Sequence, residues 1–173
     1  LVALFLFQAS NMGVADYAFE LGKDIGLENT QISNILTIAN VISISGGALV
    51  YLIGTKYGRT LPLIIGISMS SIFTFLLHYS DNVSIYFIAN TFTGIAWGFT
   101  IPYILGLCST FDSHGQMAAL AGFISKMGLA TGPLIGSLFI TDYGIGPIIN
   151  IAVFSLIVAM IASWLSSRAI EIK

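Results

Sequence analysis

Charged residues are scarce in this chain: Asp, Glu, Lys and Arg together make up 8% of its 173 residues. Soluble domains are typically about 25% charged. Hydrophobic residues make up 56% of the chain, and so few charges cannot cover a surface that faces water. We therefore expect an integral membrane protein, with the lipid bilayer as the solvent for much of the chain.

Several other absences exclude classes of function. The net charge is −2, and there is no basic cluster of the kind that binds nucleic acid. Cys108 is the single cysteine, so an internal disulfide is excluded. The chain has no H-E-x-x-H or G-x-S-x-G motif, and both histidines lie outside the apolar segments, which argues against an intramembrane enzyme. We predict no catalytic residues, no cofactor and no metal site.

The chain also lacks the features of a signal peptide. Leu1 already lies in an apolar run, without a basic stretch before it or a small-residue cleavage site after it. We expect this sequence to be part of a longer protein.

Six apolar segments are long enough to cross the roughly 30 Å of hydrocarbon in a bilayer, which takes about 20 helical residues. They run at 1–22, 31–54, 61–79, 83–108, 116–140 and 146–167. None alternates with the period of a strand, and a strand would leave backbone groups unpaired in lipid. The sequence therefore predicts an all-α membrane protein, with residues 1–173 forming one domain of six transmembrane helices.

The positions of the cations predict an orientation. Lys56 and Arg59 follow the second segment, and Arg168 and Lys173 follow the sixth, so these four residues share one side of the membrane. The opposite side has one cation, Lys23, among several acidic residues. Cytoplasmic loops carry an excess of Lys and Arg. We therefore expect the Lys56–Arg59 loop and the C-terminus to be cytoplasmic, in the cell (inner) membrane.

The chain contains a weak internal repeat. A shift of 86 residues places Ile38 on Ile124, Gly46 on Gly132, and Asn40 on Lys126. Chance similarity between two glycine-rich helices is the alternative explanation. The match predicts a three-plus-three inverted repeat, as occurs within each half of some transporters.

Two short motifs resemble those of the major facilitator superfamily. The loop "GTKYGRTLPL" is similar to the family's signature loop, with Lys56, Gly58 and Arg59 at its basic and glycine positions and Thr55 in place of its Asp. The stretch "GLATGPLIGS" is similar to a glycine- and proline-containing segment of the family's fifth or eleventh helix.

This resemblance implies helices seven to twelve of a twelve-helix transporter, with the N-terminal half as the alternative placement. A missing N-terminal six-helix half is then an expected partner. The resemblance also implies that Lys56, Gly58 and Arg59 favour one conformational state of the transporter, and that the fourth helix of this chain lines the central cavity.

Lys126 is the most unusual residue inside a predicted span. It lies ten residues beyond Gln116, which is about 15 Å along a helix and close to mid-membrane. Its flank of the helix carries small residues, so it faces either a solute or ion pathway or a purely structural partner. A separate stripe of small residues predicts close helix packing. The packing glycines of that stripe are Gly128, Gly132 and Gly136.

Other polar residues inside the spans are candidates for the pathway. They are Gln8, Asn11 and Asp16 in the first segment, Asn40 in the second, and Asn90, Thr93 and Trp97 in the fourth. Asp16 is either a coupling carboxylate or a solvated acid at the membrane interface. Asn40 either lines the cavity or packs against a neighbouring helix.

We predict a transporter that moves a small-molecule solute by alternating access, as a secondary active carrier coupled to a proton or a sodium ion. The alternative is a membrane scaffold or receptor with a transporter-like fold that does not transport. Polar residues on the inward flanks of several helices favour the transporter, because a scaffold has no need of a wet interior.

Overall fold

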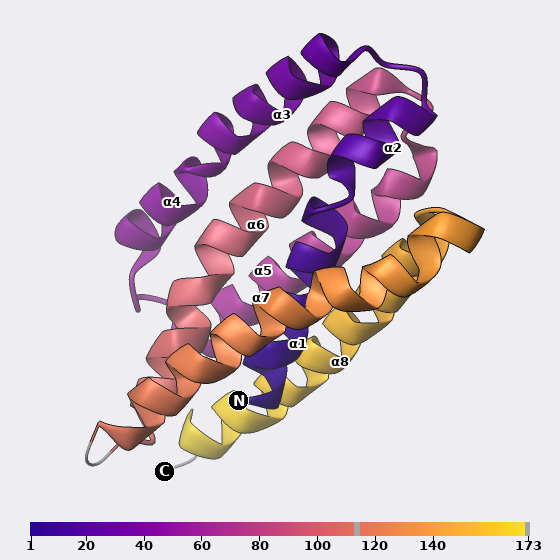
Figure 1. The fold of residues 1–173 in the computed structure, drawn as a ribbon. Coiled ribbons are helices and arrows are strands. Elements are labelled where there is room, and N and C mark those ends of the chain that lie inside the picture. Colours follow the sequence, from indigo (N-terminus) through magenta and orange to yellow (C-terminus); the bar gives the residue numbers. More distant parts are fainter. Residues whose placement is uncertain (113–114, 172–173) are drawn as a thin grey trace.

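The computed structural model describes residues 1–112 and 115–171, with side chains described up to residue 168. This part of the chain folds into a bundle of helices that passes along its long axis six times (Figure 1). The helices are α1 (Val2–Ala15), α2 (Ala18–Asp24), α3 (Asn29–Ser43), α4 (Ser45–Ile53), α5 (Thr60–Leu76), the 3-10 helix η1 (Leu77–Tyr79), α6 (Val83–Ser109), α7 (Gln116–Tyr143) and α8 (Gly146–Glu171).

Five of the six passes are long and apolar enough to cross a membrane as one helical run. They are Asn29–Ile53, Thr60–Tyr79, Val83–Ser109, Gln116–Tyr143 and Gly146–Arg168. The first pass is divided between α1 and α2, so the prediction of a single helix over residues 1–22 is wrong in this respect. α1 and α2 nevertheless follow one another along the bundle (Figure 1).

The break in the first pass has a tertiary cause. The Tyr17 backbone N–H bonds to the Val14 carbonyl at 3.2 Å, a tighter turn than an α-helix makes. The Tyr17 hydroxyl donates to the Pro133 carbonyl of α7 at 2.9 Å. Residues 15–17 contain no glycine or proline, so no local signal in the sequence indicates a break there.

A second irregularity lies between α3 and α4. The single proton of the Ser43 hydroxyl is shared between the Ala39 carbonyl, 2.8 Å from the hydroxyl oxygen, and the Thr91 carbonyl of α6, 3.2 Å from it. Hydroxyls that bond back to the preceding turn often bend helices. The Ile44 N–H accordingly bonds to the Val41 carbonyl at 3.3 Å, three residues back.

The helices pack in two groups, one around α1 and one around α6. α1 packs extensively on α7 and α8, and α6 packs on α5, α3 and α4. α5 and α8 also pack together. α3 and α4 form one edge of the bundle in Figure 1, and α7 crosses in front of α1 away from them.

The internal repeat predicted from the sequence is present in the packing. A Cβ on Gly132 of α7 would meet the Ala9 carbonyl oxygen and the Gly13 nitrogen of α1. A Cβ on Gly46 of α4 would meet the Ile95 carbonyl oxygen and the Phe99 nitrogen of α6. Each atom of the first set lies 86 residues from its counterpart in the second.

The repeat is inverted with respect to the bundle axis. α1 and α6, its first helices, run in opposite directions because three further passes separate their starting points (Figure 1). The three-plus-three inverted repeat that the sequence predicted therefore describes this fold, which is all-helical over the described residues.

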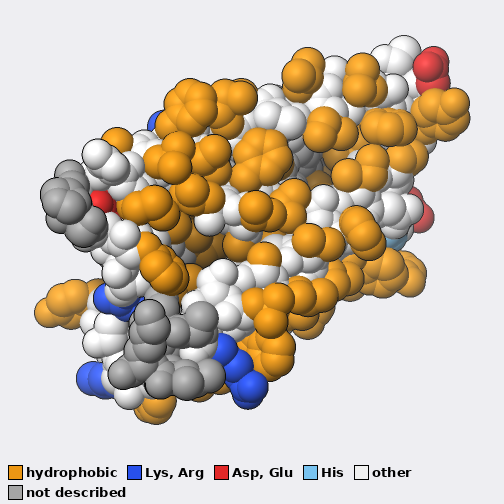
Figure 2. All heavy atoms as spheres, turned by 90° about the horizontal axis from the view of Figure 1, so that it is seen from below, with side chains coloured by type: hydrophobic (Ala, Val, Ile, Leu, Met, Phe, Trp, Pro, Cys, Tyr) orange, Lys and Arg blue, Asp and Glu red, His pale blue; other side chains and the backbone are white. Residues whose placement is uncertain are grey.

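Most charges on the surface lie near the two ends of the bundle. Figure 2 shows hydrophobic side chains along one long face, with Lys and Arg near one end and most of the visible Asp and Glu near the other. Lys23 is at the acidic end, where its Nζ lies 3.2 Å from the Glu20 carboxylate and 5.1 Å from the centroid of the Phe19 ring. An apolar band between two charged ends is the surface that a bilayer requires.

Candidate functional site

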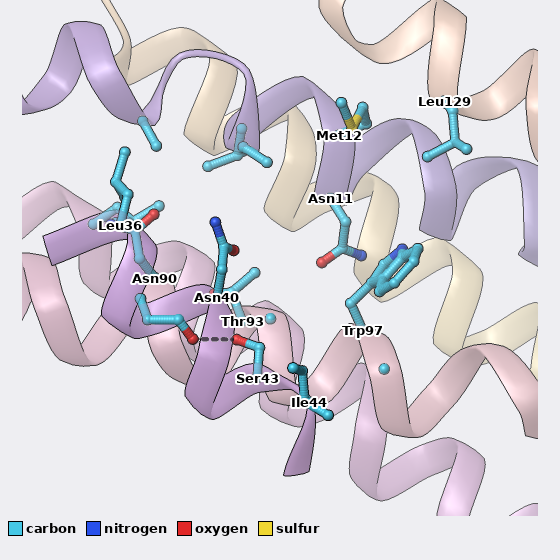
Figure 3. Close-up of a pocket in the computed structure, with 17 residues that line it drawn as sticks. Asn11, Met12, Leu36, Asn40, Ser43, Ile44, Asn90, Thr93, Trp97 and Leu129 are labelled. Carbon is cyan, nitrogen blue, oxygen red and sulfur yellow. Dashed lines mark hydrogen bonds between the residues drawn. The ribbon is translucent and has the colours of Figure 1, made fainter. Parts of the chain in front are cut away.

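A cavity of about 460 Å³ opens between the first, second and fourth passes of the chain (Figure 3). This is within the range of sites for small molecules. Its polar lining consists of Asn11 on α1, Asn40 and Ser43 on α3, and Asn90, Thr93 and Trp97 on α6. None of the residues that line it is charged, and Leu129 is the one lining residue from α7.

The carboxamides of Asn11 and Asn40 extend from opposite sides into this space (Figure 3). Asn11 is 4% exposed, and its Nδ2 donates to the Phe7 carbonyl at 2.8 Å while its Oδ1 accepts from the Ser70 hydroxyl of α5 at 2.8 Å. Asn40 is exposed and forms no hydrogen bond with any other residue that the structure describes. Its amide therefore has its full set of donors and acceptors open to a ligand.

α6 supplies the floor of the cavity. Asn90 uses its Nδ2 to donate to the Tyr86 carbonyl at 2.8 Å, which leaves its amide oxygen as an acceptor. The Thr93 hydroxyl is buried and has no hydrogen-bond partner among the described residues. A buried hydroxyl without a partner costs free energy, so a ligand that reached Thr93 would relieve that cost.

Two glycines of α6 let α3 approach α6 closely beside the cavity. Gly94 and Gly98 both line it, on the same face of α6 as Asn90 and Trp97. A Cβ at Gly94 would clash with the Ser43 hydroxyl, so a larger residue would push α3 away from α6. The sequence prediction did not include these two glycines, although their spacing of four residues within the Asn90 face is a detectable signal.

Gln8 lies behind the cavity and not in its lining. It is 3% exposed, and both ends of its amide are occupied. Nε2 donates to the Ser125 hydroxyl of α7 at 2.7 Å, and Oε1 accepts from the Trp97 Nε1 of α6 at 2.8 Å. The structure thus links α7, α1 and α6 through one carboxamide.

Lys126 is exposed and does not line the cavity of this chain. Around α7 it lies about 60° from Leu129, which borders the cavity, and about 180° from Ile135, which faces α8. The lysine therefore projects from the cavity side of α7. It forms no ion pair with any acid among the described residues.

Asp16 is exposed at the break between α1 and α2, and it is not paired with Lys126. Its neighbours Ala15 and Ala18 line the cavity, whereas Asp16 itself does not. The structure therefore brings Asn11, Asn40, Asn90, Thr93 and Trp97 together, and leaves Gln8, Asp16 and Lys126 outside the lining.

The small-residue stripe of α7 faces α1. Gly128, Gly132 and Gly136 are all buried. A Cβ on Gly128 would lie 2.7 Å from the Phe5 carbonyl oxygen, and one on Gly136 would meet the Tyr17 ring. Small residues allow helices in a membrane to approach closely enough for dispersion contacts between their backbones.

The loop between α4 and α5 is attached to the end of α6. Arg59 Nη1 donates to the Gly106 carbonyl at 2.8 Å, and the Tyr103 hydroxyl donates to the Gly54 carbonyl at 2.8 Å. Gly58 has a φ of +72°, which L side chains rarely adopt. Lys56 is exposed, and its Nζ lies 3.5 Å from the Leu52 carbonyl.

No cluster of three or more His, Cys, Asp or Glu side chains with the geometry of a metal site occurs in the described part of the chain.

A comparison with curated proteins gave no significant match. A comparison with protein families gave a match over residues 5–165 to the family described as "Sugar (and other) transporter". This match covers all six passes and confirms the resemblance that the loop and glycine motifs indicated. The chain belongs to the sugar (and other) transporter family, and it is a membrane transporter polypeptide of the major facilitator type with half of that fold.

Proposed function

We propose that this chain forms one wall of a cavity through which a small polar solute, of the sugar class, crosses the membrane by alternating access. The observation that carries the proposal is the uncharged polar lining contributed by α1, α3 and α6. Family membership supports a sugar as the solute, because the family description names sugars.

The chemistry of the lining suits a solute with several hydroxyl groups. Asn40 offers a free amide, Asn90 a free amide oxygen, and Thr93 a buried hydroxyl without a protein partner. Sugar hydroxyls both donate and accept, so they match carboxamides without requiring a charge. The indole of Trp97 adds an apolar aromatic face on which the carbon–hydrogen side of a sugar ring can pack.

Three helices, α3, α4 and α7, are largely exposed, which supports a second half of the transporter as their partner. In α3 and α4 only Ile32, Ala39 and Gly46 are buried, and in α7 only the small-residue stripe is. Of these helices, α3 lines one side of the cavity and α7 contributes Leu129 to its lining. We propose that a missing N-terminal six-helix half covers them, and that rocking of the two halves opens the cavity to each side in turn.

The position of Lys126 favours a second role for this half of the transporter, in recognising an anionic group of the solute or in coupling transport to an ion. It projects from the cavity side of α7, at the position that the repeat relates to Asn40 on the opposite wall. An unpaired cation near mid-membrane raises the free energy of the protein unless an anion pairs with it or the group loses its proton. We propose that Lys126 contacts an anionic group of the solute or joins a coupling network with a proton or a sodium ion, in which Asp16 is the candidate carboxylate.

Transport by the full-length protein in proteoliposomes tests the proposed function. We expect saturable uptake of a neutral radiolabelled hexose, with competition by other hexoses and stimulation by an inward gradient of protons or of sodium. Uptake of a hexose phosphate in preference to the neutral sugar would show that the solute is an anionic sugar and not a neutral one. Correctly inserted protein that transports neither compound would favour the scaffold or receptor alternative.

Substitution of Lys126 by Met keeps much of the stem volume and removes the charge. If Lys126 contacts the solute or the coupling network, Lys126→Met should raise KM or abolish the stimulation by the ion gradient. The matched control is Lys23→Met, which removes an exposed cation at the far end of the bundle. Wild-type KM and gradient dependence in Lys126→Met would assign the lysine a structural role.

A further inference from the structure

Gln8 joins three helices without contacting the cavity. Its carboxamide donates to the Ser125 hydroxyl at 2.7 Å and accepts from the Trp97 indole at 2.8 Å. Gln8 is 3% exposed, so its side chain is almost completely shielded from solvent. A residue placed in this way acts on the cavity through its neighbours.

Trp97 needs an acceptor of this kind. The indole N–H is a donor only, and Gln8 Oε1 is the acceptor that it meets among the described residues. Trp97 is 40% exposed and lines the cavity, so part of its surface is open to the cavity and not held by packing. The bond to Gln8 Oε1 ties the nitrogen edge of the ring to α1.

The inverted repeat shows that this contact is specific to one side of the cavity. The position equivalent to Gln8 in the second repeat is Gly94, which has no side chain. The Ser43 hydroxyl of α3 occupies the space beside Gly94. α3 therefore packs closely on α6 at Gly94, whereas at the equivalent position the Gln8 side chain bonds to α7 and to Trp97.

We propose that Gln8 is a positioning residue: it fixes the Trp97 indole as a wall of the cavity and thereby sets the shape offered to the solute. The consequence for the solute rests on the proposed transport function. The positioning of the ring does not, because it follows from the two hydrogen bonds and the burial of Gln8 alone.

Tryptophan fluorescence of the purified full-length protein tests the positioning directly. Trp97 is kept as the only tryptophan, with Trp164 and any others replaced by Phe. Gln8→Met removes both hydrogen bonds at similar volume and should free the ring, which raises quenching of Trp97 by acrylamide at least about twofold. Ser125→Ala releases only the outer end of the Gln8 amide, so it should raise quenching by less.

Gln8→Glu is the matched control. A protonated Glu can still accept from the indole with its carbonyl oxygen and donate to Ser125, so quenching should stay at the level of the parent protein. If quenching is equal in Gln8→Met, Gln8→Glu and the parent, Gln8 does not position the ring and the proposal is overturned. If Gln8→Met does not fold, Gln8→Leu decides, since it also removes both hydrogen bonds and unchanged quenching in that variant overturns the proposal equally.

Transport separates this proposal from the proposed function. Loss of one hydrogen bond that orders the ring should raise the KM for the solute about fivefold in Gln8→Met, with a smaller change in maximal rate. A freed ring with an unchanged KM would mean that the solute binds elsewhere, so the proposed site would fail while the positioning of Trp97 by Gln8 would stand. A raised KM with unchanged quenching would overturn the positioning.

Discussion

Gly46 and Gly132 hold equivalent places in the two repeats, and each lets one helix approach the carbonyl of another. The carbonyls belong to Ile95 on α6 and Ala9 on α1. Lipid tails are as apolar as most side chains, so helices in a membrane gain little from burial and depend on close packing instead. A methyl group at either position would meet backbone atoms, which cannot rotate away.

We predict that Gly132→Ala destabilises the protein by about 1–3 kcal/mol, the usual cost of overpacking. The matched control is Gly122→Ala on the same helix, where a Cβ would meet nothing within 4 Å. That control should be neutral or slightly stabilising, because Ala is a better helix former than Gly. Thermal unfolding of the full-length variants in detergent, followed by size-exclusion chromatography, provides the measurement.

The repeat supplies a second pair of variants for the same question. Gly46→Ala should behave as Gly132→Ala does, and Gly47→Ala should behave as Gly122→Ala does, since a Cβ on Gly47 would also meet nothing within 4 Å. Equal midpoints for Gly46→Ala and Gly47→Ala would contradict the packing described for α4 and α6.

Among the elements, the loop from Gly54 to Arg59 and the end of α6 form one unit. The last carbonyls of a helix lack partners within it and carry a partial negative charge. Arg59 satisfies the Gly106 carbonyl, to which the Ser109 hydroxyl also donates. The charge of Arg59 and the helix end therefore attract each other, and the loop is held at a fixed distance from α6.

We predict that Arg59→Gln slows transport while leaving KM unchanged. A charge-assisted hydrogen bond contributes about 1.5 kcal/mol, so its loss shifts the balance between access states about tenfold. Lys56→Gln is the control, because Lys56 is exposed and its contact with the Leu52 carbonyl is long at 3.5 Å. Initial rates of solute uptake at saturating and limiting concentrations distinguish the two parameters.

A tenfold lower rate in Lys56→Gln, with a normal rate in Arg59→Gln, would reverse these assignments. Equal and normal rates in both variants would leave the two cations as determinants of topology alone, through the excess of positive charge on the cytoplasmic side.

In the molecule as a whole, charge is separated along the long axis. The start of α1, the end of α8 and the loop after α4 lie at one end of the bundle in Figure 1, and that is the end where Lys and Arg gather in Figure 2. Lys23, the cation at the other end, is balanced by Glu20. The positive-inside rule therefore favours a cytoplasmic position for the loop that contains Lys56 and Arg59.

Cysteine labelling of intact cells tests this orientation. In a full-length background in which the buried Cys108 is replaced by Ala, we predict that a membrane-impermeant maleimide labels Asp81→Cys from outside. Tyr57→Cys, in the exposed loop after α4, should be labelled only after the cells are permeabilised. Labelling of Tyr57→Cys in intact cells, with none of Asp81→Cys, would invert the proposed topology.

Part of the candidate cavity was predictable from the sequence. Asn90, Thr93 and Trp97 share one face of a single uninterrupted helix, so their spacing was enough to group them. Gln8 and Asn11 share a face of α1 in the same way, yet only Asn11 lines the cavity. Helical spacing gives the direction of a side chain from its own helix, and it does not say which neighbouring side chain will occupy its hydrogen bonds.

The sequence by itself determined that this chain is a membrane protein of six helical passes with an inverted repeat, because apolar length, the rarity of charge and the 86-residue similarity are local properties of the chain. Only the tertiary structure decided where the first pass breaks, that Gln8 is buried and bonded to Trp97, and that α3 packs on α6 at Gly94. Each of these depends on an atom of another helix: the Pro133 carbonyl, the Trp97 indole or the Ser43 hydroxyl. Contacts between helices distant in the chain fix those atoms, and no periodicity within one segment encodes them.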